Sequence, residues 1–190
     1  MLRGCFKACL LAGCFSLATF LATGQEVVHA LAGTVSSINP TAKTILINTD
    51  DGSEGLFKDL TKAHASLDFD KNIRADAIAA DAFTKQGTHV IVYYFGDGEM
   101  RTAVALQDLG TGPFEMSRGT VVKFNKHEHL LTIKNSSGVE ESFHIGPTTR
   151  AETAVGVVEG YKFDPEKGDQ VRVTAAPRNG NETALFIRAS

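Results

Sequence analysis

Hydrophobic and polar positions alternate in a segment of the chain that occurs twice. Residues 33–52 read GTVSSINPTAKTILINTDDG, and residues 119–138 read GTVVKFNKHEHLLTIKNSSG. Apolar residues at every second position are typical of a strand with one buried face, and the Asn-Pro and Asp-Gly pairs are typical of turns. The first copy therefore predicts a strand at 31–39, broken by a bulge, and a second strand at 44–49.

The first copy continues with a third strand, a helix and two further strands. Residues 54–60 predict the third strand. Residues 68–86 are rich in Ala, with apolar residues at helical spacing and no Gly or Pro before Gly87, so they predict a short helix. Residues 88–95, THVIVYYF, are β-branched and aromatic and predict the fourth strand, and 102–106 predict the fifth.

The second copy repeats this order after a Gly- and Pro-rich stretch at 110–113, the best candidate linker. Residues 149–163 take the position of the helix, although their Val and Gly content is poor for one. The predicted strands of this copy lie at 121–124, 130–134, 141–145 and 168–173, with a last strand around 183–184.

Three strands, a helix and two strands is the order of the OB fold, a five-stranded Greek-key barrel. The chain is therefore expected to be all-β, with two tandem OB-like barrels at 31–110 and 117–190, each with a short helix between its third and fourth strands. Rolling up a short amphipathic sheet buries its apolar face and its two edges. A single ten-stranded β-sandwich is the alternative architecture.

Residues 1–24 predict an export signal. Arg3 and Lys7 precede an apolar run at 8–22, and small residues follow at 22–24. About 15 apolar residues are fewer than the ~20 that span a bilayer as a helix, so we expect no membrane span after cleavage. The expected location is the periplasm or the outside of the cell.

A lipid anchor is the alternative for this segment, because residues 11–14, LAGC, resemble a lipobox with Cys14 as the lipidated residue. Lys7 lies too close to it, and the apolar run continues past Cys14, so we favour the cleaved signal. All three cysteines lie within this segment. After cleavage no disulfide, thiol nucleophile or Cys metal ligand would remain.

The charge balance excludes one class of partner. The chain carries 19 basic and 22 acidic residues, and without Arg3 and Lys7 the balance is 17 to 22, a net charge of −5. Nucleic-acid binding draws its affinity mainly from a basic face. We expect no nucleic-acid partner, and instead an unknown protein, peptide or glycan partner.

The sequences GTV at 33–35, KTI at 43–45 and GDQV at 168–171 resemble those of small exported bacterial OB-like domains of unknown function. This resemblance implies the fold and export, and no specific activity. The same pattern is similar, more weakly, to the periplasmic copper chaperones of metal-efflux systems. Those chaperones hold Cu(I) with Met, His and a Trp, whereas this chain has no Trp and lacks their paired methionines.

His127 and His129 are the candidate metal ligands. Side chains at i and i+2 of an extended segment point to one side, as zinc or Cu(II) binding needs. They occupy a predicted hairpin turn, for which a solvated tip is the simpler interpretation. Residues 68–72, DFDKN, begin like a calcium loop, but Ile73 and Ala79 occupy the positions of its Gly and Glu, so these side chains are expected to cap a helix.

Tyr93, Tyr94 and Phe95 are the candidate binding surface. They are consecutive, so the alternation of a strand turns at least one of them outward, and OB barrels often bind glycans, peptides or single strands. No G-x-S-x-G, Walker loop, H-E-x-x-H or G-x-G-x-x-G is present. We therefore expect a non-enzymatic binding module without a cofactor, with a metal-binding protein or a glycan- or peptide-binding barrel as alternatives.

Overall fold

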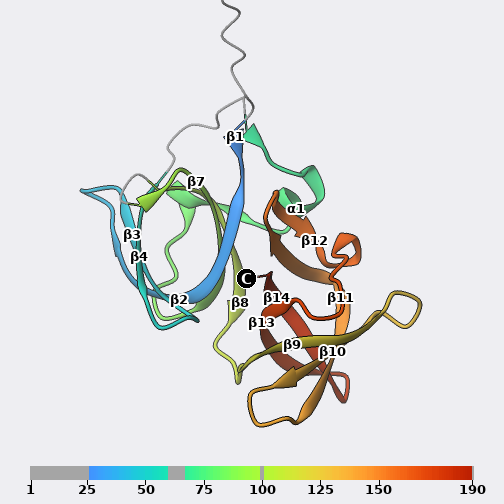
Figure 1. Ribbon diagram of the computed structural model, residues 1–190. Helices are drawn as coiled ribbons and strands as arrows, with labels where there is room; N and C mark the ends of the chain where they lie inside the picture. The colour runs from blue at the N-terminus through green and yellow to red at the C-terminus, as the bar shows by residue number, and fades with distance from the viewer. Residues whose placement is uncertain (1–25, 60–66, 99–100, 190) are drawn as a thin grey trace, which may run out of the picture.

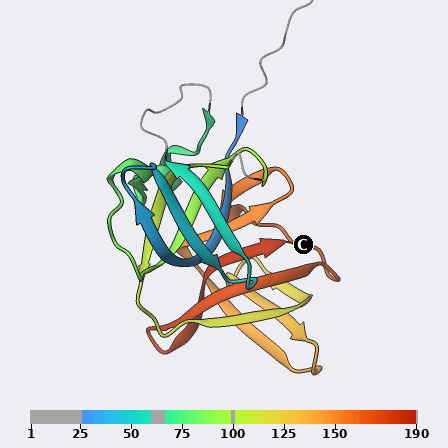
Figure 2. The same ribbon diagram turned by 90° about the vertical axis from the view of Figure 1, so that its left-hand side faces the viewer.

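The computed structural model describes residues 26–59, 67–98 and 101–189, so the predicted signal at 1–24 lies outside the described residues. Two six-stranded β-sheets make up most of the described chain. In Figure 1 the first sheet, blue to yellow-green, lies beside the second, yellow to red. Figure 2 shows the same two bodies from the side, one above the other.

The first sheet is formed by residues 29–110. Its strands follow the order β4-β3-β2-β7-β8-β6. A parallel pairing of Lys58 with Thr102 and of Asp59 with Ala103 also brings β4 beside β8. The strands are β2 (His29–Asn39), β3 (Thr44–Thr49), β4 (Glu54–Asp59), β6 (Ile78–Ala79), β7 (His89–Phe95) and β8 (Thr102–Gly110).

The second sheet is formed by residues 115–189. Its order is β10-β9-β13-β14-β11-β12, and β10 also pairs with β11, which closes five of the strands into a barrel. This closure distinguishes the sheet from the open layer of a sandwich. The strands are β9 (Glu115–Asn125), β10 (Leu130–Asn135), β11 (Glu140–Thr153), β12 (Gly156–Glu159), β13 (Gln170–Arg178) and β14 (Asn181–Ala189).

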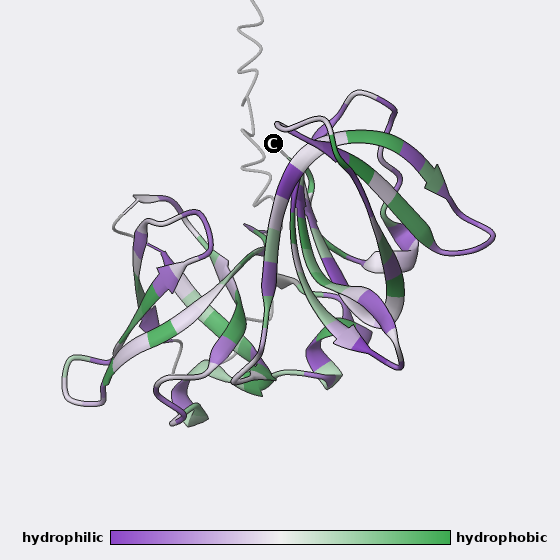
Figure 3. Ribbon diagram, turned by 90° about the horizontal axis from the view of Figure 1, so that it is seen from below, coloured by the Kyte–Doolittle hydropathy of each residue, from purple (hydrophilic) through white to green (hydrophobic). Residues whose placement is uncertain are grey.

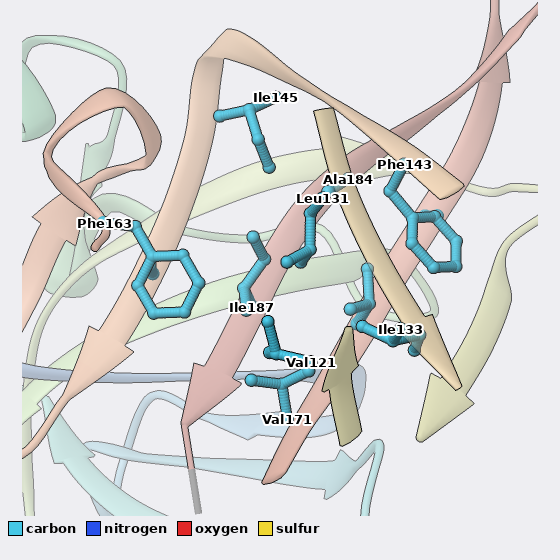
Figure 4. Packing of buried hydrophobic residues seen from close by; sticks show 12 residues of the cluster. Val121, Leu131, Ile133, Phe143, Ile145, Phe163, Val171, Ala184 and Ile187 are labelled. Atoms are coloured by element: carbon cyan, nitrogen blue, oxygen red, sulfur yellow. The ribbon is translucent and has the colours of Figure 1, made fainter. Parts of the chain in front are cut away.

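Each sheet encloses its own apolar core. In the first sheet Ile45 and Ile47 of β3 point inward and are 1% and 0% exposed, and in the second Leu131 and Ile133 of β10 are both 0% exposed. Figure 4 shows the second core, in which side chains from β9, β10, β11, β13 and β14 converge with Phe163. Hydrophobic and hydrophilic residues alternate along many of the strands in Figure 3, as a sheet with one buried face requires.

The glycines that open the two sequence copies have a steric role. A Cβ on Gly33 would overlap the carbonyl oxygen of Asn48, and one on Gly119 would overlap that of Lys134. The neighbouring strand passes close to the backbone at both positions. The predicted bulge in the first strand is confirmed, since the register of β2 against β3 shifts between Val35 and Ser37.

The helix predicted at 68–86 is wrong for most of its length. A single turn, α1 (Lys71–Ala75), forms, followed by the short strand β6 and the 3₁₀ turn η1 (Ala80–Ala82). Asp70 begins α1 as its N-cap, accepting a hydrogen bond from Asn72 N at 2.7 Å, which confirms the capping prediction. The helix does not continue beyond α1, because Ile78 and Ala79 form strand hydrogen bonds with β8 and this pairing outweighs their helix propensity.

The second predicted helix, at 149–163, is also wrong. Strand β11 runs through to Thr153, β12 turns back along it, and only the 3₁₀ turn η3 (Gly160–Lys162) follows. The β-branched residues of this segment favour extended structure, and its glycines disfavour a helix. Near the end of β11, Arg150 to Glu152 pair in parallel with β14, where Glu152 lies opposite Arg188.

Candidate functional site

The two sheets meet across a buried apolar contact. On the first sheet the outward residues Ala30, Tyr93 and Ala105 form one row across β2, β7 and β8. Phe186 of β14 joins this cluster from the second sheet, and Ile73 of α1 covers it from the side. All eight buried members are at most 4% exposed: Val28, Ala30, Ala32, Ile73, Ile91, Tyr93, Ala105 and Phe186. Burial of each large member stabilises the contact by about 1.5–3 kcal/mol.

Polar groups join the sheets at the edge of this contact. The carboxylate of Glu152 on β11 accepts hydrogen bonds from Ala30 N at 2.8 Å and from His29 Nδ1 at 2.6 Å. Burial raises the pKa of Glu152, and the bond with His29 opposes this rise. The backbone continues the connection, since Val157 N of β12 donates to Val28 O at 3.0 Å. The two sheets are therefore held together by specific bonds as well as by apolar burial.

The row of residues next to Ala30, Tyr93 and Ala105 on the same face differs in polarity and charge from its counterpart in the second sheet. In the first sheet it consists of Ala32, Ile91 and Gln107, which are register partners and are all buried. The corresponding row of the second sheet consists of the register partners Arg118, Arg172 and Arg188, on β9, β13 and β14. The side chains of Arg172 and Arg188 are 35% and 42% exposed. The second sheet thus places three arginines at neighbouring positions of adjacent strands.

Two aspartates of the first sheet approach this arginine row from the turn between β3 and β4. Asp50 Oδ2 accepts hydrogen bonds from Thr174 Oγ1 at 2.5 Å and from His89 Nε2 at 3.2 Å. Asp51 Oδ2 lies 3.7 Å from Arg172 Nη1 and 3.5 Å from Arg188 Nη1.

The carboxylate of Asp51 is strongly held in its charged form. Hydrogen bonds from the hydroxyls of Ser53 and Thr49 lower its pKa from 3.8 to about 2, and Arg172 contributes further. The short bonds from Ser53 Oγ at 2.6 Å and Thr49 Oγ1 at 2.5 Å fix its position in the turn. Asp51 is therefore ionised at neutral pH.

A hollow of about 240 Å³ lies between this turn and the second sheet. A water molecule occupies about 30 Å³ of liquid, so the hollow has the volume of a small organic molecule. Met116, which is 57% exposed, and the exposed Arg118 lie at its rim. The hollow is lined from both sheets, by Asp50, Asp51, Met116, Ser117, Arg118, Arg172, Val173 and Thr174.

The predicted aromatic surface is only partly at the surface. Tyr93 is 0% exposed and donates a hydrogen bond to Gln107 Oε1 at 2.6 Å, so it belongs to the contact between the sheets. Its burial raises its pKa. Tyr94 and Phe95 are partly buried, and Tyr94 packs edge-on against Phe57 in the first core at 5.2 Å between ring centroids. These residues do not line the hollow.

The predicted metal ligands lie in the exposed turn between β9 and β10. His127 N donates to Asn125 Oδ1 at 3.1 Å, and His129 adopts a positive φ of 51°. The ring of His129 lies 4.6 Å from that of Tyr161, centroid to centroid. Within the described ranges, no group of three or more His, Cys, Asp or Glu side chains converges. Metal binding by the two histidines stays a prediction.

The arginine row was not found from the sequence. Arg118, Arg172 and Arg188 each stand at an outward position of a strand, where an arginine is ordinary. Only the register of three strands distant in sequence places them next to one another. A signal did exist in the comparison of the copies, since Arg172 takes the position of Ile91.

No protein-family model matches the chain, and no curated protein matches it. Among solved structures, the crystal structure of Ag(I)CusF is similar at 15% identity with a TM-score of 0.33, over 42% of this chain and 100% of that chain. Similarity at this level is weak, and it assigns neither a function nor a ligand. In the part of the chain that the structure describes, no helix is both long and apolar enough to cross a membrane.

Proposed function

We propose that the protein is a non-enzymatic binding module built from two OB-like barrels, at 31–110 and 117–190, which act as one body and bind a small ligand in the hollow between them. One observation carries the proposal: the hollow is lined by residues of both sheets, Asp50 and Asp51 from the first and Arg172 and Thr174 from the second. A site of this kind exists only when both units are present, which gives a reason for their fusion.

The pairings support the tandem arrangement. In the first sheet β2 pairs with β3 and β7, β7 with β8, and β4 with β8 in parallel. In the second sheet β9 pairs with β10 and β13, β13 with β14, and β11 with β14 in parallel. This is the connectivity of a five-stranded Greek-key barrel of the OB type. The repeated sequence at 33–52 and 119–138 forms the first hairpin of each unit.

The chemistry of the hollow favours binding over catalysis. A general acid or base works best with a pKa near the operating pH, and the pKa of Asp51 is lowered to about 2. Asp50 is occupied by bonds to Thr174 and His89. The remaining lining offers guanidinium donors and the apolar side chain of Met116, which are recognition groups.

Export is part of the proposal and is supported by the sequence at 1–24, where a basic start precedes an apolar run and small residues. The partner would then be a molecule of the periplasm or of the surroundings of the cell. Mass spectrometry of the mature amino terminus tests this point. A terminus near residue 25 supports export, and a diacylglyceryl group on Cys14 would replace the soluble form by an anchored one.

The ligand site is tested by filling the hollow. Small-molecule binding to the full chain is measured by calorimetry and by NMR shift mapping, first with the wild type. Met116→Trp places a large side chain at the rim and is expected to weaken binding at least tenfold, which corresponds to about 1.4 kcal/mol. Val139→Trp is the matched control, because Val139 is also 57% exposed but lies in the turn between β10 and β11.

The two variants separate the outcomes. Loss of binding in Met116→Trp alone supports the hollow as the site. Equal binding by both variants places the ligand elsewhere, and shift changes confined to Tyr94 and Phe95 would instead support the glycan- or peptide-binding alternative. Absence of binding by the wild type across neutral and charged compounds would overturn the proposed function.

A further inference from the structure

We propose that the arginine row Arg118–Arg172–Arg188 is the recognition element of the hollow and binds the carboxylate or phosphate group of a small organic anion. This inference rests on the proposed function, since it names the ligand class of the same hollow. Arg118 and Arg172 line the hollow of about 240 Å³, and Arg188 stands next to Arg172 on β14.

The arginine row places like charges in direct opposition. Arg172 is the register partner of Arg118 on one side and of Arg188 on the other. Neighbouring strands lie about 4.8 Å apart, and like charges directly opposite each other across strands are destabilising. An anion at this row would relieve the repulsion, so the unliganded site already carries a bias toward one.

Glu152 on β11 is the register partner of Arg188 and lies at that end of the row only. Asp51 relieves the remaining repulsion only in part. Its carboxylate lies 3.5 and 3.7 Å from the guanidinium groups of Arg188 and Arg172, which is beyond hydrogen-bonding distance. Its own bonds to Ser53 and Thr49 fix it in the turn. Within the described chain, no hydrogen bond joins the side chains of Arg118, Arg172 or Arg188 to another residue, so their N–H donors are available to a ligand.

Arg118 is the least compensated member of the row. Among the described residues no acidic side chain forms an ion pair with it, and it is exposed at the rim of the hollow. The guanidinium fork matches carboxylate and phosphate oxygens in two parallel hydrogen bonds. Arg118 and Arg172 both line the hollow, so together they can hold an anion there.

The fold itself does not require these arginines. The equivalent row of the first sheet is Ala32, Ile91 and Gln107, and that sheet forms the same set of strand pairings around its own core. In the first sheet the residues of this row are buried, whereas in the second sheet Arg118 and Arg172 border a hollow. This difference separates a scaffold face from a recognition face.

The test uses citrate and inorganic phosphate as probes on the full chain, with glucose as the neutral comparator. Calorimetry is carried out at low salt, since charged contacts at exposed sites are screened as the ionic strength rises. Citrate or phosphate is expected to bind more tightly than glucose, and Arg118→Ala and Arg172→Ala are each expected to weaken binding about tenfold or more. Tighter binding of citrate assigns a carboxylate ligand, and tighter binding of phosphate assigns a phosphorylated one.

Arg178→Ala is the matched control, because Arg178 is exposed on the same strand β13 but does not line this hollow. It is expected to bind as the wild type does. Arg172→Lys keeps the charge without the planar fork and should bind more weakly than the wild type but more tightly than Arg172→Ala. Thermal unfolding of each variant checks that the fold is intact.

Three results would overturn the inference. Equal binding of citrate and phosphate by Arg118→Ala, Arg172→Ala and Arg178→Ala would show that the anion binds elsewhere. Binding of neutral compounds alone, abolished by Met116→Trp, would leave the proposed function standing and remove the arginine row as its recognition element. No binding of any probe or compound would overturn both.

Discussion

Arg150 of β11 donates a hydrogen bond from Nη2 to Oδ2 of Asp76, the residue that follows α1, and this ion pair links the second sheet to the connection between β4 and β7 of the first. The side chain of Arg150 is 2% exposed, and that of Asp76 is 46% exposed. Nη1 of Arg150 is satisfied by the carbonyl oxygens of Pro147 and Thr149, both at 3.0 Å. The buried guanidinium thus depends on Asp76 as its counter-charge.

Loss of this counter-charge should destabilise the protein. Asp76→Ala leaves Arg150 buried without an anion, and we expect the free energy of unfolding to fall by about 2 kcal/mol, less than for a fully buried pair because Asp76 is half-exposed. Arg150→Met removes the charge itself and is expected to cost less, since no unpaired buried charge remains. Urea denaturation measures both.

Asp81→Ala is the control for this pair, because Asp81 is exposed on η1 in the same connecting segment. It should change stability by less than about 0.5 kcal/mol. If Asp76→Ala unfolds at the same urea concentration as Asp81→Ala, the ion pair does not stabilise the contact.

Gly156 is expected to be required for the contact between the sheets. A Cβ at this position would lie 2.5 Å from Val27 Cγ1 and 2.9 Å from Val28 O. Gly168 has the same φ of 106° but nothing within 4 Å of its added Cβ. Gly168→Ala should therefore cost only the strain of the positive φ, about 1–2 kcal/mol, and Gly156→Ala should cost at least about 1 kcal/mol more.

The comparison of the two glycine variants by chemical denaturation isolates the steric term, because the backbone strain is common to both. Equal losses of stability would show that β12 shifts away from Val27 and Val28 without cost. A larger loss in Gly156→Ala supports a closely fitted contact at the edge of the second sheet.

Glu152 should make the stability of the protein depend on pH. Burial raises its pKa in the folded state above the ordinary value of 4.5, so the folded protein binds this proton more tightly than the unfolded chain does. Its contribution to stability is present below pH of about 4.5 and is lost as the pH rises through the folded pKa. The stability of the wild type relative to Glu152→Gln is therefore expected to decrease as the pH rises above the ordinary value of 4.5.

Glu166→Gln is the control for this titration, because Glu166 is exposed near the start of β13. The stability of Glu166→Gln relative to the wild type is measured at the same pH values. A stability difference between wild type and Glu152→Gln that is constant with pH would contradict burial as the cause of the raised pKa.

The histidine turn is tested separately from the hollow. Zinc and Cu(II) are titrated into the wild type and into the double variant His127→Ala/His129→Ala, with metal content measured on protein from its native compartment. If the turn binds metal, affinity should fall at least tenfold in the double variant, since two imidazole ligands are lost. Equal weak binding by both proteins would end the metal-binding alternative.

The strands could be predicted because their signals are local. Alternation and β-branched content predict strands at 44–49 and 88–95, and β3 and β7 form there almost residue for residue. The repeat likewise predicts the second hairpin, in which Leu131 and Ile133, two positions apart, point into a core. Burial of one face of a strand leaves a period of two in the sequence, which is legible without a structure.

The helices failed for the opposite reason. Residues 76–79 have enough Ala to favour a helix, but the edge of β8 offers Ile78 and Ala79 hydrogen-bond partners that only the folded sheet provides. Residues 150–152 are likewise held extended by pairing with β14. Tertiary pairing overrides a propensity that amounts to less than about 1 kcal/mol per residue.

The sequence by itself determined the repeated strand pattern, the glycines that open each hairpin and the apolar faces that fill each core, because these depend on neighbours in the chain. Only the tertiary structure decided which outward faces meet. Tyr93, predicted at a binding surface, is buried in the contact between the sheets. Arg118, Arg172 and Arg188 are neighbours across three strands, although they are up to 70 positions apart in the sequence. Register and packing between distant strands create that site, and no local pattern of residues encodes them.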